Sequence, residues 1–168
     1  QGTNLYRVVN FLSKASGVEG NHFVFTWDKT TNLCEVQGLI DTGIPASALG
    51  VSGVNENIHF ADEKTTWNSL GYDDTWESLY AEYGASVQPY YSPEYNAFVF
   101  RVSYFLPEDG GALAFPTSTG GKTNFVNEIF YLDGEVSEGP QWVDVCTGSY
   151  YSSLFIDADN YYVPFTNR

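Results

Sequence analysis

The sequence is poor in basic residues and has no methionine and no long apolar run. It carries 7 Lys and Arg against 21 Asp and Glu, a formal net charge of −14 over 168 residues. A chain this acidic repels nucleic-acid backbones and anionic membrane surfaces, so we expect neither as a partner. No run of about 18 apolar residues is present, and we expect no membrane insertion by this chain.

Motifs for enzyme chemistry are also missing, since the sequence contains no G-x-S-x-G, P-loop or HExxH pattern. We therefore assign no catalytic residue. A glycosidase-like hydrolase remains as an alternative, because glycoside hydrolysis needs two facing carboxylates and 21 acids supply pairs in any fold. Asp73, Asp74 and Glu77 are the acids to inspect, although their position before a helical segment is typical of helix capping.

Two cysteines, Cys34 and Cys146, are far apart and match no metal-binding or redox spacing. They form either one long-loop disulfide, which would stabilise the fold by about 3 to 5 kcal/mol, or two buried thiols. The sequence leaves both alternatives open.

Aromatic residues, by contrast, make up 17% of the chain, and glycine occurs 16 times, which favours β-structure. Apolar residues alternate with others in Ala97 to Phe105 and in His22 to Trp27, as in half-buried strands. Gly, Asn, Asp, Ser and Pro clusters separate these and further apolar runs. We predict an all-β, antiparallel β-sandwich, either Ig-like or jelly-roll-like.

One segment departs from the strand pattern. In Thr75 to Tyr83 the residues Trp76, Leu79, Tyr80 and Tyr83 have helical spacing. This predicts one short helix.

An internal repeat is visible when Trp67 to Tyr80 is aligned with Trp142 to Phe155, where Trp, Ser and Leu match without a gap. A second correspondence links Leu5 to Leu12 with Val99 to Leu106. We therefore expect a β-rich half repeat over 1–66, a repeat over 67–141 and the start of a second over 142–168, unless the whole chain is one compact domain. Because the chain starts with the later part of one repeat and stops within the next, we expect it to be a fragment of a tandem array whose ends do not coincide with the repeat boundaries.

The same segments resemble modules of Bacteroidetes cell-surface lipoproteins, which combine a Trp-x-x-Leu-Gly-Thr-Gly segment, a Tyr-Arg-Val strand and a Trp-Asp-x-x-Thr-Asn hairpin. The sequence departs from that pattern at Phe11, where the modules prefer Pro, and at Cys146, where they prefer Gly. The resemblance implies an exported, surface-displayed β-sandwich and transfers no catalytic residues. The matching stretches are Leu5 to Phe11, Phe25 to Val36, Trp67 to Tyr80 and Trp142 to Phe155.

Two ligand sites are suggested by residue type. Asp157, Asp159 and Asn160 place oxygen donors close together in a turn, as Ca²⁺ loops do, although the glycine and the distant glutamate of an EF-hand are missing. Surplus aromatic rings with nearby carboxylates are typical of sugar binding, because rings stack on the apolar faces of pyranoses. We predict such a platform at Tyr90, Tyr91, Glu94 and Tyr95.

These observations favour a non-catalytic extracellular or cell-surface module that binds a glycan or another surface ligand, or acts in adhesion, with no cofactor other than Ca²⁺. The alternative is a self-assembling unit of a surface filament or layer, in which the terminal strand of one copy completes another. The hydrolase is the second alternative.

Overall fold

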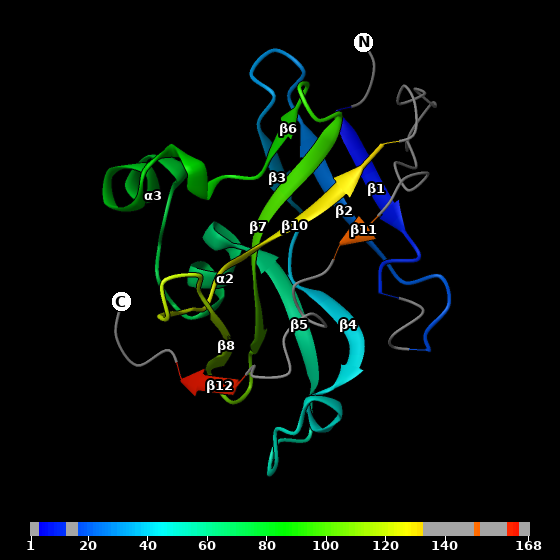
Figure 1. Cartoon of the computed structure of the whole chain (residues 1–168), viewed down its shortest axis with the longest axis vertical. Coiled ribbons are helices and arrows are strands. Elements are labelled where there is room, and N and C mark those ends of the chain that lie inside the picture. Colours follow the sequence, from blue (N-terminus) through cyan, green and yellow to red (C-terminus); the bar gives the residue numbers. More distant parts are fainter. Residues whose placement is uncertain (1–3, 13–16, 133–149, 152–160, 165–168) are drawn as a thin grey trace.

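The computed structural model describes residues 4–12, 17–132, 150–151 and 161–164. Within this part of the chain most of the regular structure is antiparallel β-strand, with a smaller share of helix (Figure 1). The prediction of an all-β, sandwich-like fold is confirmed.

The smaller sheet has three strands, β1 (Leu5–Val9), β2 (His22–Trp27) and β3 (Cys34–Val36), in the order β1-β2-β3. The alternation expected for His22 to Trp27 is present, since Phe23, Phe25 and Trp27 are buried and the residues between them are not. β-Branched and aromatic side chains at every second position favour this pleated, one-sided strand.

The larger sheet has nine strands among the described residues, and β7 (Ala97–Leu106) is its centre. Strand β7 pairs with β5, β6, β8 and β10, so its ten residues contact most of the sheet. The other strands are β4 (Ile40–Pro45), β5 (Asn57–Asp62), β6 (Tyr90–Ser92), β8 (Gly111–Pro116), β9 (Lys122–Thr123), β10 (Val126–Tyr131), β11 (Tyr150–Tyr151) and β12 (Tyr161–Pro164).

The two sheets adjoin where β3 meets β6. An isolated bridge joins Leu33 to Tyr90, the backbone N–H of Cys34 donates to the carbonyl of Pro89 at 2.8 Å, and the N–H of Tyr91 donates to the carbonyl of Asn32 at 2.8 Å. Backbone pairing therefore runs without interruption from the smaller sheet into the larger one. The sandwich is closed along this side.

Aromatic rings fill the space between the sheets. Phe100 lies 5.3 Å from Phe23, 5.0 Å from Phe25 and 5.6 Å from Phe130 between ring centroids, in each case edge to face. This arrangement adds a favourable quadrupole interaction to the apolar burial. The main core runs from Tyr6 to Phe130 and so takes residues from both 1–66 and 67–141.

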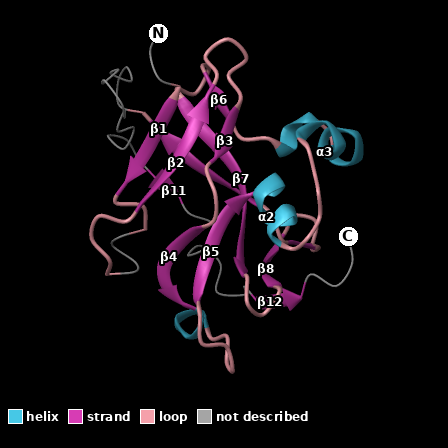
Figure 2. Ribbon diagram, turned by 180° about the vertical axis from the view of Figure 1, so that it is seen from behind, coloured by secondary structure: helices cyan, strands magenta, loops and turns pink. Residues whose placement is uncertain are grey.

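Two α-helices, α2 (Glu63–Ser69) and α3 (Trp76–Tyr83), lie near each other on one side of the larger sheet, away from β1 (Figures 1 and 2). The predicted short helix is α3, whereas α2 was not predicted. They share a small second core of Trp67, Leu79, Val87 and Phe125. The short 3-10 helices η1 (Ala46–Leu49) and η2 (Ala85–Val87) complete the described elements, and none of the helices in this part of the chain is long and apolar enough to cross a membrane.

The proposed repeat units are only partly described. Leu5 to Leu12 and Val99 to Leu106 both contain strands, but β1 is an outer strand of the smaller sheet and β7 is the centre of the larger one. Trp67 to Tyr80 covers the end of α2, a turn and the first part of α3, and most of Trp142 to Phe155 lies outside the described residues. The division into repeat segments stays a prediction.

Candidate functional site

The outward side of the larger sheet carries a row of apolar and aromatic side chains that crosses β6, β7 and β10 and continues to Leu33, the residue just before β3. Leu33 bridges to Tyr90, Tyr90 pairs with Val99, and Val99 pairs with Ile129. Residues directly opposite each other in an antiparallel pair point to the same face of a sheet. Their neighbours Tyr91, Phe98 and Phe130 belong to the inward-facing set, so this row faces away from the main core.

Tyr131 lies on the same face, one step further along the sheet. It pairs with Ala97, which is two residues from Val99 in the strand. The side chains of Tyr90 and Tyr131 are 40% and 42% exposed, while Leu33, Val99 and Ile129 are half-buried. We call these five residues the tyrosine platform: Leu33, Tyr90, Val99, Ile129 and Tyr131.

The register gives the size of the platform. Tyr90 and Tyr131 are separated by β7, with an offset of two residues along the strands. Strands lie about 4.8 Å apart and residues rise about 3.4 Å, which places the two Cα atoms about 12 Å apart.

The structure distributes the four predicted platform residues over two faces and a turn. Tyr90 is on the platform, and Glu94 and Tyr95 are exposed in the turn between β6 and β7, with Tyr95 64% exposed. Tyr91 points inward, with its ring 4.8 Å from that of Trp27 and its hydroxyl donating to Asn96 Oδ1 at 2.8 Å. Tyr91 therefore shares no surface with Tyr90, and Tyr131 was missed because its place depends on the pairing of β10 with β7.

A polar cluster borders the platform next to α3. Glu35 follows Leu33 by two residues on the same side of β3, and its Oε1 lies 2.6 Å from Lys64 Nζ. Its Oε2 accepts a hydrogen bond from Trp76 Nε1 at 3.0 Å, and Lys64 lies 5.2 Å above the Trp76 ring. The carboxylate thus holds α2 and α3 against β3, and it neutralises the lysine.

A second contact holds α3 at the junction of the sheets. The Tyr80 hydroxyl donates to Gln88 Oε1, and Gln88 Nε2 donates to the carbonyl oxygen of Cys34 at 3.1 Å. Burial, together with the negative charges of Glu77 and Glu35, raises the pKa of Tyr80 above its ordinary value. Gln88 precedes Tyr90 by two residues, so this contact ties helix α3 to the segment that leads into β6.

Arg101 marks the side of the platform that lies next to α2. It follows Val99 by two residues, and its Nε lies 2.9 Å from Oε2 of the buried Glu63. Its guanidinium lies 5.4 Å above the Phe125 ring. The charge of this arginine is therefore already matched inside the protein.

Asp62 is the acid that stands out by its environment. It is fully buried, and burial raises the pKa of its carboxyl group to about 6, although hydrogen bonds from backbone N–H groups oppose the shift. Oδ2 accepts from the N–H of Val36 and Oδ1 from the N–H of Thr65, both at 2.8 Å. Because these bonds cap α2 and tie it to β3, the group has an architectural role.

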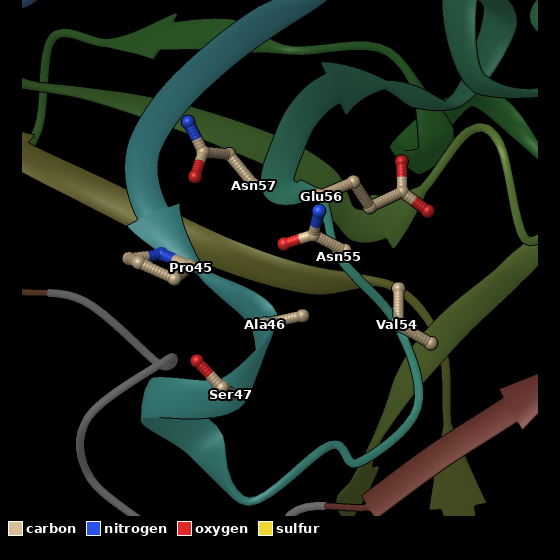
Figure 3. A pocket seen from close by; sticks show the side chains of 7 residues that line it. All are labelled: Pro45, Ala46, Ser47, Val54, Asn55, Glu56 and Asn57. Atoms are coloured by element: carbon tan, nitrogen blue, oxygen red, sulfur yellow. The ribbon is translucent and has the colours of Figure 1, made fainter.

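A cavity of about 340 Å³ lies where η1 faces the start of β5 (Figure 3). Two of its polar side chains are engaged elsewhere. Glu56 accepts hydrogen bonds from the N–H groups of Glu108 and Asp109, and Asn57 Nδ2 donates to Asp41 Oδ2 at 3.2 Å. The cavity is lined by Pro45, Ala46, Ser47, Val54, Asn55, Glu56 and Asn57. None of these lining residues is aromatic, whereas the platform carries two exposed tyrosine rings, which makes the platform the stronger candidate for sugar binding.

The remaining predicted sites fall partly or wholly beyond the described residues. Asp157, Asp159 and Asn160 lie outside them, and the Ca²⁺ site stays a prediction. Cys34 is buried, which raises the pKa of its thiol, and it forms no disulfide within the described residues; Cys146 lies outside them, so the choice between disulfide and thiols stays open. In the described part of the chain, no group of three or more His, Cys, Asp or Glu is placed to hold a metal ion.

In comparisons with known proteins, no family model, curated protein or solved structure matches the chain.

Proposed function

We propose that this protein is a non-catalytic extracellular or cell-surface module whose tyrosine platform binds a glycan. The observation that carries the proposal is the pair of exposed rings, Tyr90 and Tyr131, on one face of a rigid sheet with Val99 and Ile129 between them. Aromatic rings offer a flat apolar surface to the C–H faces of sugars, and their hydroxyls stay available to water and ligand.

The surroundings of the platform support binding over other uses of this surface. Central strand β7 pairs on both edges, so the floor is rigid and the rings need little ordering when a ligand binds. The net charge of −14 keeps the module soluble and repels anionic surfaces. A place outside the cell accords with the resemblance to surface lipoprotein modules.

The two alternatives receive less support. Strand β1 pairs with β2 over five residues and β12 pairs with β8 over four, within the same chain, which speaks against exchange of these strands between copies. For a hydrolase, Asp62 has the raised pKa expected of a general acid, but both of its oxygens accept backbone N–H bonds away from solvent.

The test is a glycan array probed with the natural chain and with Tyr90→Ala and Tyr131→Ala. We expect specific glycan signals that fall by about five- to thirtyfold in each variant, since losing one ring that a bound sugar covers costs about 1 to 2 kcal/mol. Tyr72→Ala is the matched control, because Tyr72 is 41% exposed and lies between α2 and α3, off the platform.

Melting temperatures of the three variants separate binding from folding effects. An array without any glycan signal from the folded natural chain contradicts the proposal, and so does a signal that both platform variants retain in full.

A further inference from the structure

The platform has a length and a charge environment that narrow the chemistry of its ligand. Resting on the proposed function, we infer that it binds an uncharged oligosaccharide of several sugar units, laid across the sheet from Tyr90 to Tyr131. A single sugar or an acidic glycan fits the site poorly. Three features of the structure lead to this inference.

The first feature is the distance between the exposed rings. Tyr90 lies on β6 and Tyr131 on β10, with the whole of β7 between them. Their Cα separation of about 12 Å exceeds the span of one pyranose ring. A monosaccharide can stack on one tyrosine, and contact with both requires a chain of sugars.

The second feature is the apolar floor between the rings. Val99 and Ile129 pair directly and are half-buried, so they fill the space between Tyr90 and Tyr131 without standing above them. Such a floor contacts the C–H faces of successive sugars and leaves their hydroxyls in water. It offers no fixed charge to a ligand.

The third feature is that the basic side chains bordering the platform are already paired. Lys64 contacts Glu35 at 2.6 Å, and Arg101 contacts Glu63 at 2.9 Å. Each cation also stacks over a ring, Lys64 over Trp76 and Arg101 over Phe125. A uronic acid or sulfate group approaching this face meets neutralised cations and a chain of net charge −14.

The polar border instead suits neutral hydroxyl groups. Glu35 presents its partly exposed carboxylate beside the row that begins at Leu33 and Tyr90, and each of its oxygens keeps a lone pair beyond its contact with Lys64 or Trp76. A sugar hydroxyl can donate to such oxygens without burying an unmatched charge. This gives the chain of sugars a polar contact at the end next to α3.

The experiment is calorimetric titration of the natural chain with two matched length series, each from monosaccharide to hexasaccharide. The neutral series comprises cello-, manno- and fully N-acetylated chito-oligosaccharides, and the acidic series comprises oligogalacturonides. We expect binding within the neutral series, with affinity rising by at least about tenfold from monosaccharide to tetrasaccharide. The dissociation constant should not change between low and high sodium chloride, because no ion pair forms.

Variants then test whether the two exposed tyrosines cause the dependence of affinity on oligosaccharide length. Tyr90→Ala and Tyr131→Ala should each lower the affinity for the tetrasaccharide by about tenfold and reduce the increase of affinity with oligosaccharide length. Tyr72→Ala should leave both quantities unchanged. Circular dichroism confirms that each variant is folded.

The outcomes separate the inference from the function on which it rests. If oligogalacturonides bind more tightly than neutral chains, or a monosaccharide binds as tightly as a hexasaccharide, the inference is overturned. The glycan-binding function still stands in those cases, provided that the tyrosine variants lose the binding. If neither series binds and the glycan array is also silent, the proposed function itself fails.

Discussion

Asp62 shows how one buried side chain links three parts of the fold. Its two oxygens accept the N–H of Val36 in β3 and the N–H of Thr65 in α2, and the residue itself ends β5. A carboxylate with both oxygens hydrogen-bonded is tolerated in the interior, but burial and the negative charge of Glu35 still favour its neutral form.

This environment predicts a specific dependence of stability on pH. The pKa of Asp62 is raised from 3.8 to about 6 in the folded chain, so between these values the folded state binds the proton more readily than the unfolded state. The stabilising contribution of this proton is complete below about pH 4 and is lost as the pH rises through about 6.

Urea denaturation across this pH range measures the effect. Asp62→Asn should remove this part of the slope and lower the free energy of unfolding by about 1 to 3 kcal/mol, because the amide nitrogen cannot accept the second N–H bond. Asp73→Asn, at an exposed position, is the control and should keep the slope of the natural chain. Equal slopes in the natural chain and Asp62→Asn would contradict the raised pKa.

At the scale of the element, helix α3 begins with a capping box. The Thr75 hydroxyl accepts the N–H of Ser78 at 3.2 Å, and the Ser78 hydroxyl accepts the N–H of Thr75 at 3.0 Å. These bonds satisfy N–H groups that have no partner inside the helix. The cap matters because α3 buries few side chains, with Leu79 as its fully buried residue.

We therefore expect Thr75→Ala to lower the free energy of unfolding by about 1 kcal/mol, as lost N-caps do. Thr75→Ser keeps the hydroxyl and should retain most of the stability. Chemical denaturation followed by circular dichroism compares the two. Equal losses in both variants would mean that the methyl group of Thr75, and not its hydrogen bond, stabilises the helix.

At the scale of the whole molecule, the aromatic core makes the two sheets one cooperative unit. Phe100 on the central strand contacts Phe23 and Phe25 of the smaller sheet and Phe130 of the larger one. Continuous backbone pairing at the junction of β3 and β6 adds to this connection. Neither sheet can bury its apolar face without the other.

Two neighbouring residues of β7 should therefore respond differently to truncation. Phe100→Ala should lower the free energy of unfolding by about 3 to 5 kcal/mol, because it leaves a cavity among rings. Val99 lies half-buried on the platform side of the strand. Val99→Ala should therefore lower the free energy of unfolding by only about 1 kcal/mol or less, and its main effect should be weaker glycan binding.

Urea denaturation followed by both fluorescence and far-ultraviolet circular dichroism tests this difference. The two signals should change together if the sheets unfold as one. Separate transitions in the natural chain, or equal costs for the two substitutions, would contradict the single-core arrangement.

Part of the fold could be predicted because the responsible patterns are local. The alternation in His22 to Trp27 produces β2, and the spacing of Trp76, Leu79 and Tyr80 produces α3. Helix α2 was not predicted, since Trp67 and Leu70 alone make no long periodic pattern and the helix depends on Asp62 as its cap. Caps formed by a residue that also ends a buried strand are hard to identify from sequence.

The sequence could predict that the candidate site is an exposed aromatic surface, but not which residues form it. That Tyr90 and Tyr91 face opposite ways follows from the two-residue period of any strand. Which of them is inside was decided by Trp27, which packs against Tyr91 from a distant part of the chain, together with Phe98 in the neighbouring strand β7.

The sequence by itself determined an acidic, aromatic-rich chain of short strands, because charge, composition and alternation are properties of neighbouring residues. Only the tertiary structure placed Tyr131 on the same face as Tyr90, since this depends on the register of β6 and β10 against opposite edges of β7. It also matched Lys64 and Arg101 with acids from other elements. Contacts between strands far apart in the chain are set by the packing of the whole core, which no local pattern encodes.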